Sequence, residues 1–571
     1  MPTVADLLVH RLLASGVRTL VGLPGGGSNL DLIEAAGRAG LPFVLSHTET
    51  AGALIACAQA ELTGRPGACL ATLGPGVASL VNGAAHARLD RVPLLLLTDA
   101  MPASGRDIYQ HQRFDHAALL APVTKGSVTM EAERADELIA GALELAVTST
   151  PGPVHIDLAP DVARQPAVLC GTHAAVASTH SAAIDVAIDL EAARALLANA
   201  RRPIIIAGLG VRDARDADAL RNLCEKHRIP ALVTYKAKGV IPDAHPLFGG
   251  VFTHGALERP IVESADLIIG VGLDPIELLP RPWDYRAPVV MMSRWPLEQR
   301  HMPIAVSIVG DLAESLHAIN AMLQSSEQSS KQSCNQSSEQ SCNQTSKQPD
   351  KHLSLQSANE WREADIRSHA LRQRDALRVT SASTGGWAPW QAVEAAARIV
   401  GPDIQVTVDA GAHMFPIMTL WPARRARQIL ISNGLSTMGF ALPSAIGAAL
   451  LDRTRRVVAL TGDGGLLMCL AELGTAAREG LKVTTIVFND RSLSLIRIKQ
   501  EKLGYPEVGM SLDGVDWLSA AKTFGVPAWR AHNDDEMTRC LTESAATDGP
   551  SLIEAVIDPG SYPETMRVLR G

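Results

Sequence analysis

The chain has 571 residues, enough for roughly three or four domains of ordinary size. Its net charge of −8 provides no basic field that would attract nucleic acid or an anionic membrane surface. No apolar run approaches the roughly 20 residues needed to span a bilayer, and the eight cysteines form no C-x-x-C pair. We therefore expect a cytoplasmic protein without a zinc site, a disulfide framework or a membrane segment.

Residues 1–168 alternate short apolar runs with amphipathic segments. The strand-like runs are LVGLPGG, PFVLSHTE, GACLATLG, VPLLLLTDA and PVHIDLAP. This alternation predicts a doubly wound parallel sheet. Gly25 and the turn Gly74-Pro75-Gly76 each follow a strand, and Glu49 follows another strand and opens an alanine-rich helix. Because the carboxyl ends of parallel strands share one sheet edge, these residues should lie along the same edge.

Glu49 can be interpreted in two ways. An acid in the first turn of a helix interacts favourably with the helix dipole and needs no further role. Alternatively, Glu49 is a catalytic carboxylate at the sheet edge. The choice between the two depends on what the rest of the chain binds.

Residues 185–323 form a second α/β pattern, with the strand-like runs RRPIIIAGLGV, ADLIIGVGLD and PVVMMSRW. Gly208-Leu209-Gly210 opens a helix but lacks the third glycine of a dinucleotide fingerprint. We therefore favour a structural domain, although FAD binding stays possible.

The segment 324–385 is expected to be a low-complexity linker followed by a helix. It contains six tetrads, SSEQ-SSKQ-SCNQ-SSEQ-SCNQ-TSKQ, over residues 325–348. They have no apolar periodicity that could offset the entropy cost of ordering, so we expect disorder there.

The third domain, residues 386–571, contains the most informative stretch. A strand over Val457–Leu460 is followed by the turn Gly462-Asp463-Gly464-Gly465 and a helix to about Glu479. A second strand, Val483–Phe488, ends at Asn489-Asp490. The glycines and the helix N-terminus suit a phosphate group, and the acids Asp463 and Asp490 suit a divalent cation. The stretch therefore predicts a metal-diphosphate site.

The spacing from Gly-Asp-Gly to Asn489, 26 residues after Asp463, is similar to the thiamine diphosphate signature. The N-terminal motifs GLPGG, SHTETAGALIA, TLGPGVASLVNG, LDRVPLLLLTD and PVTK resemble the pyrimidine-binding domain of the acetolactate synthase (acetohydroxyacid synthase) branch of thiamine diphosphate enzymes. The C-terminal motifs VDAGAHMF, SNGLSTMGFALPSAIGAAL and GDGGLLMCLAEL resemble its diphosphate-binding domain. The resemblance implies a thiamine diphosphate-binding fold of three doubly wound α/β domains: pyrimidine-binding, central and diphosphate-binding.

The resemblance also assigns roles to matching residues. Glu49 would hydrogen-bond the aminopyrimidine ring of thiamine diphosphate, and Met438 would keep the cofactor bent. Asp463, Asp490 and the backbone carbonyl of Ser492 match the ligands of Mg²⁺. The full set expected to bind the cofactor is Gly25, Glu49, Gly411, His413, Met438, Gly464, Gly465 and Asp490.

Gln112 matches a substrate-side glutamine of the family, and His111 beside it is either catalytic or a solvated loop residue. The chain also departs from the family's pattern. Asp490, Ala412 and His111 stand where asparagine, glutamine and phenylalanine are usual, and Ser293-Arg294 stand where several relatives have aspartates. Lys499 replaces a specificity-setting tryptophan. It either pairs with an additional anionic group on the substrate or extends into water at the pocket rim.

The implied activity is decarboxylation of a 2-oxo acid with carboligation, as in acetolactate synthase. The alternatives are a lyase of the benzaldehyde lyase or 2-hydroxyacyl-CoA lyase type, a simple 2-oxo acid decarboxylase, a flavin-dependent pyruvate oxidase, and a non-catalytic cofactor-binding paralogue. The resemblance further implies a homodimer or homotetramer with active sites at the subunit interface.

Overall fold

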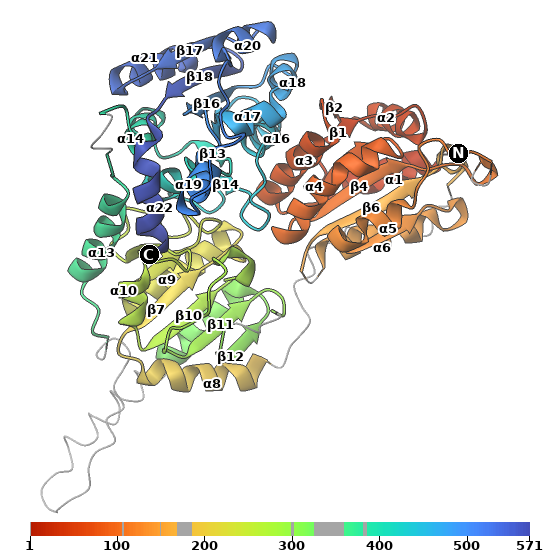
Figure 1. Cartoon of the computed structure of the whole chain (residues 1–571). Coiled ribbons are helices and arrows are strands. Elements are labelled where there is room, and N and C mark those ends of the chain that lie inside the picture. Colours follow the sequence, from red (N-terminus) through yellow and green to blue (C-terminus); the bar gives the residue numbers. More distant parts are fainter. Residues whose placement is uncertain are drawn as a thin grey trace, which may run out of the picture. The chain divides into compact units, whose positions relative to one another are not determined.

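The computed structural model describes residues 2–105, 108–148, 150–167, 186–297, 302–324, 359–380 and 385–571. These residues form three six-stranded parallel sheets with helices between most successive strands (Figure 1). The predicted class of three doubly wound α/β domains is therefore confirmed. The N-terminal and C-terminal sheets belong to one compact unit, and the central sheet belongs to a second. The tetrads predicted to be disordered lie outside the described residues.

The N-terminal sheet has the strand order β2-β1-β3-β4-β6-β5. Its strands are β1 (Leu20–Leu23), β2 (Phe43–Leu45), β3 (Gly67–Ala71), β4 (Leu94–Asp99), β5 (Gly126–Thr129) and β6 (Pro153–Leu158). Its helices are α1 (Val4–Ser15), α2 (Ser28–Ala39), α3 (Glu49–Thr63), α4 (Pro75–Leu89), α5 (His116–Leu120), α6 (Ala135–Val147) and α7 (Pro160–Ala163). The central strands β3 and β4 are buried along their whole length, as expected for a sheet covered on both faces.

The C-terminal sheet repeats this topology in the order β14-β13-β15-β16-β18-β17. Its strands are β13 (Gln405–Val408), β14 (Ile429–Ile431), β15 (Val457–Gly462), β16 (Val483–Asn489), β17 (Ala528–Ala531) and β18 (Ser551–Val556). Its helices are α14 (Pro389–Val400), α15 (Met414–Leu420), α16 (Ala441–Leu451), α17 (Asp463–Cys469), α18 (Glu472–Arg478), α19 (Ser494–Lys502), α20 (Trp517–Thr523) and α21 (Asp534–Ala546), followed by α22 (Tyr562–Arg570). The two domains therefore present equivalent sheet edges.

The central sheet has a different order, β12-β11-β10-β7-β8-β9. Its strands are β7 (Pro203–Ala207), β8 (Ala231–Val233), β9 (Phe248–Val251), β10 (Leu267–Val271), β11 (Val289–Ser293) and β12 (Ile304–Val309). The helices are α8 (Val186–Asn199), α9 (Ala214–His227), α10 (Arg259–Glu263), a helix over 312–324, and α13 (Glu363–Ala376). The chain runs outward in both directions from β7 and β10, so the crevice between these strands is the topological switch point where such sheets bind nucleotides.

Helix α3, which begins with Glu49, packs against α16 of the C-terminal domain. The close approach requires a glycine in α16, because a Cβ atom at Gly447 would lie 2.4 Å from the backbone oxygen of Ile55. The N-terminal and C-terminal domains of one chain thus share a packed interface.

The helix expected after the Gly-Asp-Gly turn is interrupted and forms α17 and α18. The second helix begins at Glu472, which is buried and accepts a hydrogen bond from the His47 backbone N–H at 3.0 Å. The interruption therefore lies where the C-terminal domain contacts the loop before Glu49. The five cysteines within the described residues are buried, and none of them forms a disulfide with another described residue. In the described part of the chain, no helix combines the length and apolar character needed to cross a bilayer.

Candidate active site

Glu49 is the first residue of α3, and only 8% of it is exposed. Thr48 caps the helix by accepting a hydrogen bond from the Ala51 N–H at 3.1 Å. Burial raises the pKa of Glu49 above its ordinary value. A Cβ atom at Gly76, in the first turn of α4, would lie 3.2 Å from Glu49 Oε1. The sheet edge therefore holds a buried carboxyl group against a glycine turn.

The turn containing Gly25 lies on the same edge, after β1. A side chain at Gly25 would overlap Thr72, since its Cβ atom would lie 2.1 Å from Thr72 Oγ1. The buried Asp99 fixes the turn by accepting hydrogen bonds from the Ser28 hydroxyl at 2.6 Å and the Asn29 N–H at 2.8 Å. Position 25 therefore requires glycine, because any side chain there would overlap Thr72.

Gln112 and His111 lie in an exposed loop before α5. Gln112 has a left-handed backbone, with φ of 58°. Its carbonyl oxygen packs against Gly74, where a Cβ atom would lie 2.6 Å away. The structure therefore places Gln112 next to the Gly74-Pro75-Gly76 turn, whose other end contacts Glu49.

At the equivalent edge of the C-terminal sheet, Asp463 and Asp490 follow β15 and β16. Asp463 is buried, and its Oδ2 atom has no hydrogen-bond partner among the described residues. Burial and the neighbouring Asp490 carboxylate raise the pKa of Asp463 to about 7. Burial likewise raises the pKa of Asp490 to about 6. A buried and a half-buried carboxyl group, with an oxygen that lacks a partner among the described residues, suit a hard divalent cation.

The third expected ligand, Ser492, is buried, and its N–H donates to Asp490 Oδ1 at 3.1 Å. The side chain of Asn489 has a different partner from that of Asp490. Its side-chain amide donates to Glu554 Oε1 on β18 at 2.7 Å. Asn489 therefore supports the loop, and Asp490 is the residue whose carboxylate interacts with Asp463.

Met438 is half-buried and lies beside the glycine turn. A Cβ atom at Gly464 would lie 3.2 Å from the Met438 methyl group and 2.7 Å from the side chain of Leu493. Met438 and Leu493 therefore form an apolar wall next to the two acids.

His413 lies across the turn from Gly411 and Gly462. A Cβ atom at either glycine would be within 3.0 Å of the imidazole ring. The ring stacks on Phe488 at 5.7 Å between centroids, and its Nε2 atom is buried without a partner among the described residues. Burial lowers the pKa of His413 to about 4, so the ring is neutral when no anion lies beside it.

Asp409, at the end of β13, is a site residue that the sequence analysis missed. It is fully buried and accepts hydrogen bonds from the Gly439 N–H at 3.1 Å and the Thr461 hydroxyl at 2.8 Å. Its Oδ2 atom occupies the space where Gly465 would carry a Cβ atom, 2.5 Å away. Asp409 therefore holds the Met438 loop to the Gly464-Gly465 turn. An acid at the carboxyl end of a parallel strand was the available signal.

The predicted residues gather in two groups. The first contains Gly25, Glu49, Gln112 and His111, at the edge of the N-terminal sheet. The second contains Gly411, His413, Met438, Asp463, Gly464, Gly465, Asp490 and Ser492, at the edge of the C-terminal sheet. Among the described residues, the Glu49 carboxyl group lies near Gly76 and Ser79, which belong to the same domain as the first group.

A buried acid on one sheet edge, together with two acids beside a glycine turn on the equivalent edge of a second sheet, is an arrangement typical of a cofactor-dependent enzyme. The chain matches three parts of one family in order. Residues 2–119 match "Thiamine pyrophosphate enzyme, N-terminal TPP binding domain", 190–319 match the central domain, and 409–555 match the C-terminal TPP binding domain. The chain belongs to this family and is a thiamine diphosphate-dependent enzyme.

Curated relatives of this chain include acetolactate synthases. The chain is 29% identical to the catabolic acetolactate synthase of Raoultella terrigena, over 98% of this chain and 96% of the relative. It is 29% identical to the isozyme 1 large subunit of Escherichia coli K12, over 97% and 94%. It is 26% identical to acetolactate synthase of Bacillus subtilis, over 97% and 93%.

Proposed function

We propose that this enzyme uses thiamine diphosphate and Mg²⁺ to decarboxylate a 2-oxo acid and to join the remaining acyl unit to an acceptor, as acetolactate synthases do. The observation that carries the proposal is the buried carboxyl of Glu49. A paralogue without catalysis would gain nothing from keeping an acid in this setting, because burying a carboxyl group costs stability. A lyase and a simple decarboxylase remain outcomes of the test below.

When bound, thiamine diphosphate supplies a nucleophilic carbon that attacks a carbonyl and then accepts the electron pair left when carbon dioxide departs. Glu49 would exchange a proton with a ring nitrogen of the aminopyrimidine. Its raised pKa brings proton transfer closer to neutral pH, where a general acid or base is most effective. Gly76 lets the α4 turn approach this carboxyl group.

Asp463, Asp490 and the Ser492 carbonyl would hold Mg²⁺ against the diphosphate. The buried, unsatisfied Oδ2 atom of Asp463 supports this role. Gly464 and Gly465 begin α17, whose N–H groups can bind phosphate oxygens. His413 contributes a buried ring nitrogen that has no partner in the part of the chain that the structure describes. Met438 would exclude water from below the cofactor rings.

The residues of the central domain do not fit a flavin dinucleotide at the switch point between β7 and β10. The carboxylate of Glu277 already accepts the Leu209 N–H at 2.9 Å, which is the type of donor a dinucleotide phosphate would need. A Cβ atom at Gly208 would lie 2.5 Å from the same carboxylate. The Gly210 N–H bonds to the Gly272 oxygen at 2.8 Å across the crevice. We infer that the Glu277 carboxyl group occupies the place that a ligand phosphate would need.

We further infer that two chains form each active site. Apolar side chains are exposed around both groups of site residues, which would be unfavourable in a lone chain. They include Ile108 and Tyr109, 70% and 59% exposed, near Gln112, and Met468 and Ile496, 61% and 43% exposed, near the acids. Pairing the N-terminal domain of one chain with the C-terminal domain of another would cover both patches.

Two measurements test the proposed function. Purified enzyme with thiamine diphosphate and Mg²⁺ should form carbon dioxide and a carboligated product from at least one 2-oxo acid in a panel supplied with aldehyde or 2-oxo acid acceptors. Products without carbon dioxide release would indicate a lyase instead, and carbon dioxide without ligation would indicate a decarboxylase. In the second measurement, Glu49→Gln should lower kcat by roughly 10² to 10⁴-fold, because it removes proton transfer but keeps a hydrogen bond. Cofactor affinity should change little, and a variant with normal turnover would contradict the role of Glu49.

A further inference from the structure

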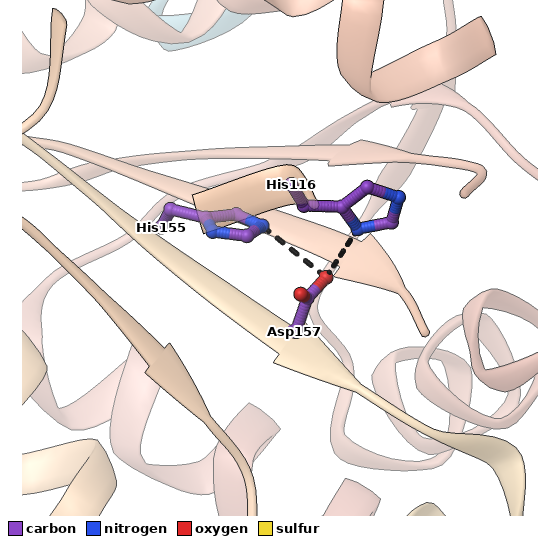
Figure 2. Close-up of side chains that lie close together, drawn as sticks. All are labelled: His116, His155 and Asp157. Carbon is purple, nitrogen blue, oxygen red and sulfur yellow. Dashed lines mark hydrogen bonds and ion pairs between the residues drawn. The ribbon is translucent and has the colours of Figure 1, made fainter. Parts of the chain in front are cut away.

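The buried His116 and His155 and the half-buried Asp157 form a cluster in the N-terminal domain (Figure 2). His116 Nδ1 lies 2.9 Å from Asp157 Oδ1, and His155 Nε2 lies 3.3 Å from the same oxygen. Thr98 donates to this oxygen at 2.7 Å. Burial raises the pKa of Asp157, but the hydrogen bonds from His116, His155 and Thr98 outweigh burial and lower it below its ordinary value. Asp157 is therefore an ionised acceptor.

Two histidines and a carboxylate could in principle bind a metal ion. The hydrogen bond at the other ring nitrogen of His116, Nε2, argues against a metal ion at this cluster. His116 Nε2 accepts a hydrogen bond from the Gly74 backbone N–H at 3.2 Å. A neutral imidazole that gives its Nδ1 lone pair to a metal carries its proton on Nε2, where it would face the Gly74 N–H. Because that backbone group is always a donor, His116 must carry its proton on Nδ1 and donate it to Asp157.

Gly74 is the first residue of the Gly74-Pro75-Gly76 turn. This turn lies next to Gln112, predicted to face the substrate, and Glu49, predicted to bind the cofactor. The backbone of Gly74, with φ of 64° and ψ of −105°, favours glycine. The turn lies close to both residues, because a Cβ atom at Gly74 would lie 2.6 Å from the Gln112 carbonyl oxygen and one at Gly76 would lie 3.2 Å from Glu49 Oε1. The chain of hydrogen bonds from Asp157 through His116 therefore ends on a turn that packs against two candidate active-site residues.

We propose that His116 is a positioning residue that fixes Glu49 and Gln112 through the Gly74-Pro75-Gly76 turn. The proposal rests on the proposed function, because it assigns His116 to the site in which Glu49 moves a proton. His116 also opens α5, only four residues after Gln112, so one side chain holds both the loop and the turn. Losing it would free the turn and misplace Glu49, and a displacement of this kind costs on the order of 10 to 100-fold in rate.

The first test needs no cofactor. Hydrogen exchange of the Gly74 amide in the full-length apoenzyme should accelerate in His116→Phe. The phenyl ring is similar in size to imidazole but has no nitrogen that could accept a hydrogen bond from the Gly74 N–H. His155→Phe is the matched control: it removes a buried histidine of the same cluster that does not contact Gly74. Its Gly74 amide should stay protected. Equal protection in wild type and His116→Phe would overturn the proposal.

The second test measures exchange of the C2 proton of bound thiamine diphosphate, which requires no knowledge of the substrate. Wild type should accelerate this exchange over free cofactor; if it does not, the proposed function fails. If wild type does, His116→Phe should slow the exchange by about 10 to 100-fold at saturating cofactor. His155→Phe should leave it close to wild type. Equal slowing in both variants would indicate a merely structural cluster and overturn the proposal.

Substitutions of Asp157 test whether His116 must carry its proton on Nδ1. Asp157→Asn keeps an oxygen that can accept from His116 Nδ1, so it should retain most of the exchange rate. Asp157→Leu removes that acceptor and frees His116 to place its proton on Nε2, so it should resemble His116→Phe. The double variant His116→Phe/Asp157→Leu should be no slower than either single variant, since both break one hydrogen-bond chain. Additive losses would overturn the coupling.

Discussion

Glu277 allows a quantitative prediction about pH and stability. It lies at the switch point of the central sheet, where it accepts hydrogen bonds from the Leu209 N–H at 2.9 Å, the Asp274 N–H at 3.2 Å and the Thr234 hydroxyl. Burial raises its pKa from 4.5 to about 8. Between these values the folded protein holds a proton that the unfolded chain releases, so stability falls as the pH rises.

The size of the effect follows from this shift. At about 1.4 kcal/mol per pKa unit, raising the pH from about 6 to about 8 should cost the fold about 2 kcal/mol through Glu277. Glu277→Gln removes the ionisation and keeps the contacts, because its amide oxygen can accept from Leu209 and Asp274 and its amide N–H can donate to Thr234. The stability of Glu277→Gln relative to wild type should therefore increase as the pH rises.

Thermal unfolding of the full-length protein tests this prediction. The difference in Tm between Glu277→Gln and wild type should grow by roughly 4 to 8 °C between the two pH values, for a cooperative unit of this size. Other titrating groups cancel in the comparison because both proteins share them. A difference that is the same at both pH values would refute the argument, and with it the view that a protonated acid fills the crevice.

Two further predictions concern the C-terminal domain. Gly465→Ala should lower Tm and weaken thiamine diphosphate binding, because its Cβ atom would lie 2.5 Å from Asp409 Oδ2. Gly141→Ala, on α6, should do neither, because its Cβ atom would meet no described residue outside its own helix within 4 Å. Equal effects of the two substitutions would contradict this packing. Lys499, exposed on α19, is predicted to pair with an additional anionic group on the substrate. Lys499→Met should then reduce kcat/KM by about 10-fold or more for such a substrate and spare neutral analogues, and equal losses for both would reject this specificity.

The sequence was sufficient to predict the features that depend on strand ends and local turns. Asp463 and Asp490 could be placed together because each follows an apolar run that had to be a parallel strand, and such strands end at one edge. The Gly464-Gly465 turn could be predicted for the same reason. The interruption between α17 and α18 could not, because it coincides with a contact between Glu472 and His47, residues far apart in the chain.

The residues that hold the site residues in place could also not be predicted from local sequence patterns. Asp409 was overlooked because its four donors come from three separate segments of the chain, although its position after a strand was visible. The bond between His116 and Asp157 joins residues 41 positions apart, and the Gly74 N–H that fixes the tautomer comes from a third segment. Such networks depend on tertiary packing, which spacing along the chain does not reveal.

The central claim is that Glu49 of one chain and Asp463 of another serve one thiamine diphosphate site, and subunit complementation tests it most directly. Glu49→Gln and Asp463→Asn chains with different affinity tags would be co-expressed, and the mixed dimers purified through both tags. Each variant alone should fail to accelerate exchange of the cofactor C2 proton. A mixed dimer contains one site with both native residues, so it should recover about half of the wild-type exchange per dimer. Mixed dimers as inactive as the single variants would contradict the shared site.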